Sequence, residues 1–166
     1  MIKLSLKIAG WMFISLICVG PVLAQNKTII LVRHAEKVDA SQDPELSPEG
    51  KLRAERLAKI MKKYKPGAVY STDFKRTRDT AGPIATRRKL QVQTYDPKDP
   101  AALIDAIMKS RTKRFLVVGH SNTIPGLANL IGRKEIFRNL DDPEYGVIWI
   151  VRIRDGHVRK TEVIPY

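Results

Sequence analysis

Four side chains of this sequence, two arginines and two histidines, have the types needed to bind and attack a phosphoryl group. Forked guanidinium groups match the oxygens of a phosphate dianion and stabilise the charge that develops on them during attack at phosphorus. A neutral imidazole has a lone pair that can attack phosphorus in line. Neighbouring positive charge disfavours the protonated imidazole and so preserves that lone pair. The four residues are Arg33, His34, Arg76 and His120.

These residues follow short apolar runs that have the composition of buried strands. The run 29–32 precedes Arg33 and His34, the run 115–118 precedes His120, and the remaining arginine lies just beyond a third short run. The carboxyl ends of parallel strands share one edge of a sheet, and ligands bind there. The four side chains are therefore predicted to converge on a single anion-binding pocket.

Strand-like runs alternate with segments of helical period as far as the C-terminus, without repeats or an internal linker. This alternation predicts an α/β fold, a three-layer sandwich with a mostly parallel central sheet. The expected strands are 29–32, 68–70, 90–94, 115–118, 147–153 and 158–164, and the expected helices begin near residues 48, 75, 101 and 124.

Local signals indicate where several of these elements begin and end. Ser47 is expected to cap the first helix, and Asp155-Gly156 predicts a hairpin turn between the last two strands. Gly82-Pro83 is expected to kink or shorten the second helix, and Gly132 to close the last one.

Residues 1–24 are predicted to be an export signal. Lys3 and Lys7 precede an apolar run at 8–19, and small residues up to Ala24 offer a cleavage site. The domain is then 25–166, and the protein is expected to be exported to the periplasm or secreted. An uncleaved membrane anchor is the alternative, but the apolar stretch is short for a span. With the signal cleaved, no stable membrane insertion is expected.

The formal net charge of +13 is strongly basic, and the single cysteine, Cys18, lies in the predicted signal. A mature chain would therefore contain no disulfide and no thiolate metal site. Such a surface can attract nucleic acid, anionic lipid or phosphorylated small molecules, or can simply be well solvated. Basic runs do not interleave with aromatic residues, so nucleic acid is not an expected partner. The sequence gives no prediction of oligomeric state.

Four motifs together resemble the histidine phosphatase superfamily, the phosphoglycerate mutase-like proteins. They are Leu31-Val32-Arg33-His34-Ala35-Glu36-Lys37, Leu46-Ser47-Pro48-Glu49-Gly50, Tyr70-Ser71-Thr72-Asp73-Phe74-Lys75-Arg76-Thr77-Arg78-Asp79-Thr80-Ala81 and Val117-Val118-Gly119-His120-Ser121-Asn122-Thr123. They occur in the family's order and span nearly the whole predicted domain. The RHAEK form of the first motif is similar to a subset of small exported phosphatases.

The resemblance implies a phosphoglycerate mutase-like fold and a phosphatase that acts on a small phosphorylated substrate through a phosphohistidine intermediate. It implies that His34 is the nucleophile and that Arg33, Arg76 and His120 bind and polarise the phosphoryl group. It implies no metal and no organic cofactor. One ring nitrogen of His34 is expected to be held by a carbonyl, which would fix the tautomer.

The proton donor and the reaction class leave alternatives open. Glu36, Asp96 and Asp99 are weak candidates for the acid that protonates the leaving group. A catalytically inactive phosphate-binding module would carry the same four residues. A serine hydrolase is a third possibility: Ser121 lies in a segment similar to a nucleophile elbow, and the expected partners would be Asp141 or Asp142 and His157.

Overall fold

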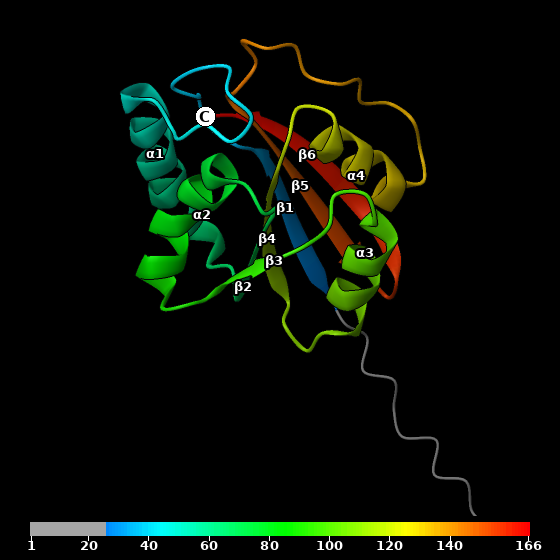
Figure 1. The fold of residues 1–166 in the computed structure, drawn as a ribbon. Helices are drawn as coiled ribbons and strands as arrows, with labels where there is room; N and C mark the ends of the chain where they lie inside the picture. Colours follow the sequence, from blue (N-terminus) through cyan, green and yellow to red (C-terminus); the bar gives the residue numbers. More distant parts are fainter. Residues whose placement is uncertain (1–25) are drawn as a thin grey trace, which may run out of the picture.

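A computed structural model describes residues 26–166 as one six-stranded sheet with helices on both faces (Figure 1). The export signal predicted at 1–24 lies outside the described residues. The strand order is β3-β2-β4-β1-β5-β6. The strands are β1 (Lys27–Arg33), β2 (Ala68–Ser71), β3 (Val92–Thr94), β4 (Arg114–Gly119), β5 (Val147–Arg154) and β6 (His157–Pro165).

The prediction of a mostly parallel sheet is confirmed. β3, β2, β4 and β1 are mutually parallel, and only β5 runs against its neighbours β1 and β6. The register pairs Arg33 of β1 with Gly119 of β4, and Ser71 of β2 with Val118. The predicted site residues therefore follow strands whose carboxyl ends lie side by side at one end of the sheet.

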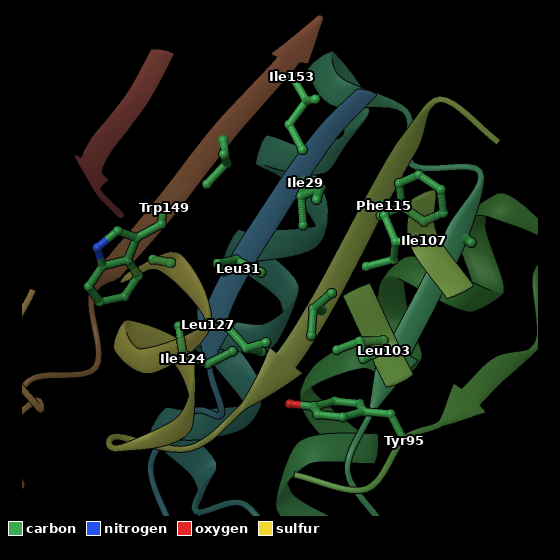
Figure 2. Close-up of a cluster of buried hydrophobic side chains, with 14 residues drawn as sticks. Ile29, Leu31, Tyr95, Leu103, Ile107, Phe115, Ile124, Leu127, Trp149 and Ile153 are labelled. Atoms are coloured by element: carbon green, nitrogen blue, oxygen red, sulfur yellow. The ribbon is translucent and has the colours of Figure 1, made fainter. Parts of the chain in front are cut away.

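The helices are α1 (Pro48–Tyr64), α2 (Lys75–Arg88), α3 (Pro100–Lys109) and α4 (Thr123–Gly132). α1 and α2 pack on one face of the sheet, where Leu57 and Ile84 are buried against the strands. α3 and α4 cover the other face, where Leu103 and Leu127 belong to the same buried cluster as Phe115 (Figure 2). The two hydrophobic clusters on opposite faces confirm the three-layer sandwich.

Most helix boundaries agree with the local sequence signals. Ser47 caps α1 as predicted, because its side chain accepts a hydrogen bond from the Gly50 amide at 3.0 Å. The sequence predicts that Gly82-Pro83 kinks or shortens the second helix, and the shortening does not occur, because α2 continues to Arg88. The missing N–H of Pro83 removes one helix hydrogen bond, and the buried residues of α2 on either side hold the helix against the sheet.

Gly132 does not provide the left-handed residue that ends α4. It is the last helical residue, and Arg133 takes the left-handed conformation with φ 52°. Lys65 and Lys89 end α1 and α2 in the same conformation. Within residues 26–166, no helix is long and apolar enough to cross a membrane.

Candidate active site

His34 lies at the carboxyl end of β1 and is held by the backbone around it. Its amide donates to the Gly119 carbonyl at 2.9 Å, and its ring Nδ1 lies 2.8 Å from the Ala35 carbonyl oxygen. A carbonyl can only accept, so Nδ1 carries the proton and Nε2 keeps the lone pair. This confirms the prediction that a carbonyl holds one ring nitrogen of His34, and it identifies Nε2 as the nucleophilic atom of the neutral ring.

His120 faces His34 across the site, with ring centroids 5.4 Å apart and ring planes at 68°. Burial lowers the pKa of His34 to about 3, against the opposing hydrogen bond to Ala35, and the charges of His120, Arg76 and Arg33 add to the lowering. Burial, followed by the two arginines, lowers the pKa of His120 to about 4. Both rings are therefore neutral at neutral pH. The arginines act in the predicted direction, but burial is the larger cause of both lowered pKa values.

Arg33 is 2% exposed and is engaged by the segment 133–146, which follows α4. Its Nη1 donates to the backbone oxygens of Asp141, Asp142 and Glu144 at 2.8, 3.1 and 3.2 Å. Its Nη2 donates to the side chain of Asp142 at 3.2 Å. The guanidinium group thus fixes this segment beside the site. Its Nε is buried and has no hydrogen-bond partner among the described residues.

Arg76 enters the site from the first turn of α2. Its guanidinium carbon lies 4.3 Å from the centroid of the Phe74 ring, and its Nη1 lies 3.9 Å from the carboxylate of Asp43. Its Nε, like that of Arg33, is buried without a hydrogen-bond partner among the described residues. A buried N–H donor without an acceptor is costly. Two such donors, both electrostatically coupled to His34, form a site that an anion would satisfy.

Thr72 and Thr77 support His120, and the sequence analysis did not assign them a role. His120 Nε2 lies 2.9 Å from Thr72 Oγ1, which lies 2.9 Å from Thr77 Oγ1. Thr77 directs its hydroxyl proton to the carbonyl oxygens of Thr72 and Phe74, at 3.0 and 2.8 Å. Thr72 then donates to Thr77, and His120 Nε2 donates to Thr72. His120 therefore presents its unprotonated Nδ1 away from this chain of hydroxyls.

Tyr145 is a second site residue that the sequence analysis did not identify. Its ring centroid lies 6.0 Å from that of His34 and 4.0 Å from the guanidinium carbon of Arg33. It belongs to the segment that Arg33 anchors through its backbone. No motif in the neighbouring sequence indicates that Tyr145 lies near His34. Backbone oxygens, which every residue has, accept most of the hydrogen bonds that hold this segment on Arg33.

The three candidate proton donors have other tasks in this structure. Glu36 is paired with Arg53 at 2.6 Å. Burial acts to raise the pKa of Glu36, but the hydrogen bond and charge of Arg53 outweigh it and leave that pKa lowered. Asp96 accepts from the Lys98 amide, and Asp99 caps α3 by accepting from the Ala102 amide. Glu36 is thus held as a carboxylate, and the two aspartates stabilise local backbone.

The residues proposed for a serine hydrolase are not brought together. His157 starts β6 and pairs with Arg154 at the hairpin, beside the amino end of β1, whereas Asp141 contacts Arg33 at its carboxyl end. The length of β1 separates them, roughly 20 Å at the rise of a strand. Among the described residues, no group of three or more His, Cys, Asp or Glu side chains could hold a metal ion.

Comparison with solved structures identifies the class of fold as phosphoglycerate mutase-like α/β. A putative alpha-ribazole-5'-P phosphatase from Escherichia coli matches with a TM-score of 0.71 and 12% identity, covering 84% of this chain and 96% of that one. The protein histidine phosphatase SixA complexed with tungstate matches with a TM-score of 0.66 and 17% identity, covering 83% and 96%. A mycobacterial glucosyl-3-phosphoglycerate phosphatase matches with a TM-score of 0.68 and 12% identity, covering 86% and 99%.

The family profile of the histidine phosphatase superfamily (branch 1) matches residues 29–97, a range that contains Arg33, His34 and Arg76. No curated protein matches the chain. The profile match over residues 29–97 and the shared fold agree with the resemblance that the four motifs indicate.

Proposed function

We propose that this protein is a metal-independent phosphatase that hydrolyses phosphomonoesters or phosphohistidine through a phosphohistidine intermediate on His34. The observation that carries the proposal is the pairing of a neutral His34, protonated on Nδ1, with two buried guanidinium Nε donors that have no acceptor within residues 26–166. This arrangement supplies a nucleophilic lone pair and a positive cradle for the phosphoryl oxygens in one place.

The reaction follows from these contacts in two displacements. Arg33 and Arg76 bind the phosphoryl oxygens, and His34 Nε2 forms a bond to phosphorus while the bond to the leaving oxygen or nitrogen breaks. Water then attacks the phosphohistidine, which releases inorganic phosphate and returns the electron pair to Nε2. The two arginines offset the charge on the phosphoryl oxygens in both steps, whereas the neutral His120 adds no positive charge of its own.

The two substrate classes differ in what they require of the leaving group. An alkoxide must gain a proton as it departs, and Glu36, the candidate nearest in sequence to the nucleophile, is held as a carboxylate by Arg53. The imidazole of a phosphohistidine is a better leaving group because it can carry its own proton. Structural relatives bear names of both classes, a glucosyl-3-phosphoglycerate phosphatase and a protein histidine phosphatase. We therefore include both in the proposal.

The proposed site of action is outside the cytoplasm, in the periplasm or secreted. This part of the proposal rests on the sequence of residues 1–24, with its two lysines, apolar run and small residues before Gln25. A fusion of these residues to a reporter that is active only after export would test it, because a reporter that stays inside the cell would contradict it.

The decisive experiment uses the chain from Gln25 onward, which contains every described element. We expect it to hydrolyse p-nitrophenyl phosphate or a phosphohistidine peptide, and rapid acid-free quenching should trap an N-linked phosphoryl group on the protein. His34→Ala should abolish both turnover and trapping. His157→Ala is the matched control, because that histidine is exposed and lies far from the site. It should leave both signals unchanged.

Two outcomes would reject the proposed enzyme. Turnover that survives His34→Ala would place the chemistry elsewhere. Binding of vanadate or phosphate at the site without turnover of either substrate class would instead identify the catalytically inactive phosphate-binding module.

A further inference from the structure

The charges of this protein are separated along the strand direction. Every connection at the end of the sheet opposite His34 contributes exposed lysines or arginines: α1 to β2, α2 to β3, α3 to β4 and the β5–β6 hairpin. We call this surface the basic end. Its exposed residues are Lys62, Lys63, Lys65, Arg87, Arg88, Lys89, Lys109, Arg111, Lys113, Arg114, Arg154 and Arg159.

Few carboxylates neutralise the basic end. Arg87 pairs with Glu55, Lys109 with Asp105 at 2.7 Å, and Arg154 with Asp155 at 3.7 Å. The other members of the basic end form no ion pair within residues 26–166. Acidic residues gather instead around the predicted site, where the loops and turns contain Asp39, Asp43, Glu45, Asp73, Asp96, Asp99, Asp141, Asp142 and Glu144. The field of the basic end is therefore largely uncompensated.

The basic end lies too far from His34 to bind the substrate or to take part in the proposed reaction. The amino end of β1 lies there, since Thr28 pairs with Arg114 and Lys27 with Ile153, whereas His34 follows the other end of β1. In Figure 1 this end is the lower edge of the sheet, and the loops around the site are at the top. The site rim also carries cations such as Arg78 and Arg138, but these pair with Asp73 and Glu144, so the uncompensated exposed positive charge lies mainly at the basic end and not around His34.

The place where the chain enters the fold indicates the kind of partner. β1 begins at Lys27 within the basic end, and the sequence before it contains the apolar run 8–19. Only residues 20–26 separate that run from β1, so a bilayer that binds the run would also keep the basic end within a short length of chain from the lipid surface. Lysines and arginines close to an apolar segment attract anionic headgroups, each contributing to binding within a Debye length.

The basic end also contains a cavity lined by arginines, which could hold an anionic lipid headgroup. A cavity of about 790 Å³ opens there and is lined by Arg152, Arg154 and Arg159. Among the described residues, aromatic rings are sparse at the basic end: Tyr64 is half-buried with the Lys63 ammonium 5.7 Å from its ring centroid, and His157 lies at the tip of the β5–β6 hairpin, so they form no continuous platform on which nucleic-acid bases could stack. We propose that the basic end binds the surface of an anionic membrane and holds the active site facing away from it.

The test measures sedimentation of the chain from Gln25 onward with vesicles. Binding is expected to vesicles that contain phosphatidylglycerol, not to vesicles of phosphatidylcholine alone, and it should fall steeply as salt is raised. The double variant Lys62→Glu/Lys113→Glu should bind roughly tenfold or more weakly. The matched variant Lys51→Glu/Lys98→Glu makes the same change in net charge at the other end of the molecule, and it should bind nearly as well as the parent.

Three outcomes would overturn the proposal. They are equal loss of binding in both double variants, binding to neutral vesicles that salt does not weaken, and displacement from anionic vesicles by a DNA duplex at a lower concentration than lipid. Turnover of p-nitrophenyl phosphate is expected to be the same in the parent and in both double variants. The proposal therefore stands or falls independently of the proposed phosphatase reaction.

Discussion

The Oγ1 of Thr72 lies 2.9 Å from Nε2 of His120, and both side chains belong to a hydrogen-bonded chain that ends on backbone carbonyls. This contact connects the segment after β2 to the segment after β4, so it fixes the position of His120 as well as its tautomer. Thr72 is completely buried. It acts on the chemistry through His120 and is a positioning residue.

Substituting Thr72 tests this arrangement. Thr72→Val keeps the shape of the side chain and removes the hydroxyl, so we expect kcat to fall roughly tenfold, the scale of one net hydrogen bond. Thr72→Ser restores the hydroxyl and should recover most of the activity. Steady-state kinetics would distinguish this role from simple support of the fold, because a structural role alone predicts lower thermal stability with kcat retained in the folded fraction.

The two neutral histidines should make stability depend on pH. In the folded protein the pKa values of His34 and His120 are lowered to about 3 and about 4, from an ordinary value of 6.5. The unfolded chain therefore binds more protons between these values, and stability is lost as pH falls from about 6.5 through about 4 for His120 and about 3 for His34. Thermal melting across this range should show the decline.

Removal of one of these histidines provides the control for the pH effect. His120→Gln should give a shallower decline in melting temperature than the parent, whereas His157→Gln, at an exposed position, should reproduce the parent slope. Parallel slopes in all three proteins would mean that other groups cause the acid sensitivity.

Arg33 should stabilise the segment 133–146 as well as bind phosphate. Arg33→Lys keeps one charge but cannot reproduce bonds to three backbone oxygens together with the bond to Asp142. We expect faster hydrogen exchange at residues 141–146 and a loss of activity of at least about tenfold. Asp142→Asn is the comparison, because that side chain is 87% exposed and should change exchange little. Unchanged exchange in Arg33→Lys would refute the anchoring role.

Gly50 should be intolerant of any side chain. A Cβ there would lie 2.3 Å from the backbone oxygen of Glu36, two residues beyond the proposed nucleophile. Gly50→Ala should therefore destabilise the protein by about 2 kcal/mol or more, in the range of overpacked cores. Urea unfolding would measure the change.

Gly126→Ala is the control for this clash, because nothing lies within 4 Å of the added Cβ in α4. Alanine is the better helix former by about 0.5–1 kcal/mol, so this variant should be as stable as the parent or more stable. A Gly50→Ala protein with parent stability would show that the close approach of α1 to Glu36 is not rigid.

Much of this fold could be predicted because the strong signals are local. The run 115–118 is fully buried as expected, and Asp155-Gly156 forms the turn between the last two strands. The convergence of Arg33, Arg76 and the two histidines followed from a single rule, that parallel strands end at one edge. Residue type and the position of each residue after a predicted strand were enough to predict it.

The parts that escaped prediction depend on contacts without a side-chain signature. The segment 133–146 docks on Arg33 through carbonyl oxygens, which every residue has, so nothing in its composition identifies Tyr145 as a neighbour of His34. The task of Thr72 is fixed by distances to Thr77 and His120, which are separated from it by 5 and 48 positions. The helix that continues through Pro83 shows packing outweighing one lost backbone bond.

Three helices end on a residue whose backbone favours glycine, yet Lys65, Lys89 and Arg133 occupy those positions with φ near 50°. The left-handed conformation costs a residue with a Cβ about 1 kcal/mol. Glycine at these three positions would remove that cost, so this fold could be more stable to heat than it is with the present sequence. Lys65 and Lys89 belong to the basic end, which we propose binds lipid. Part of the positive charge of that surface is therefore carried by residues in a strained backbone conformation.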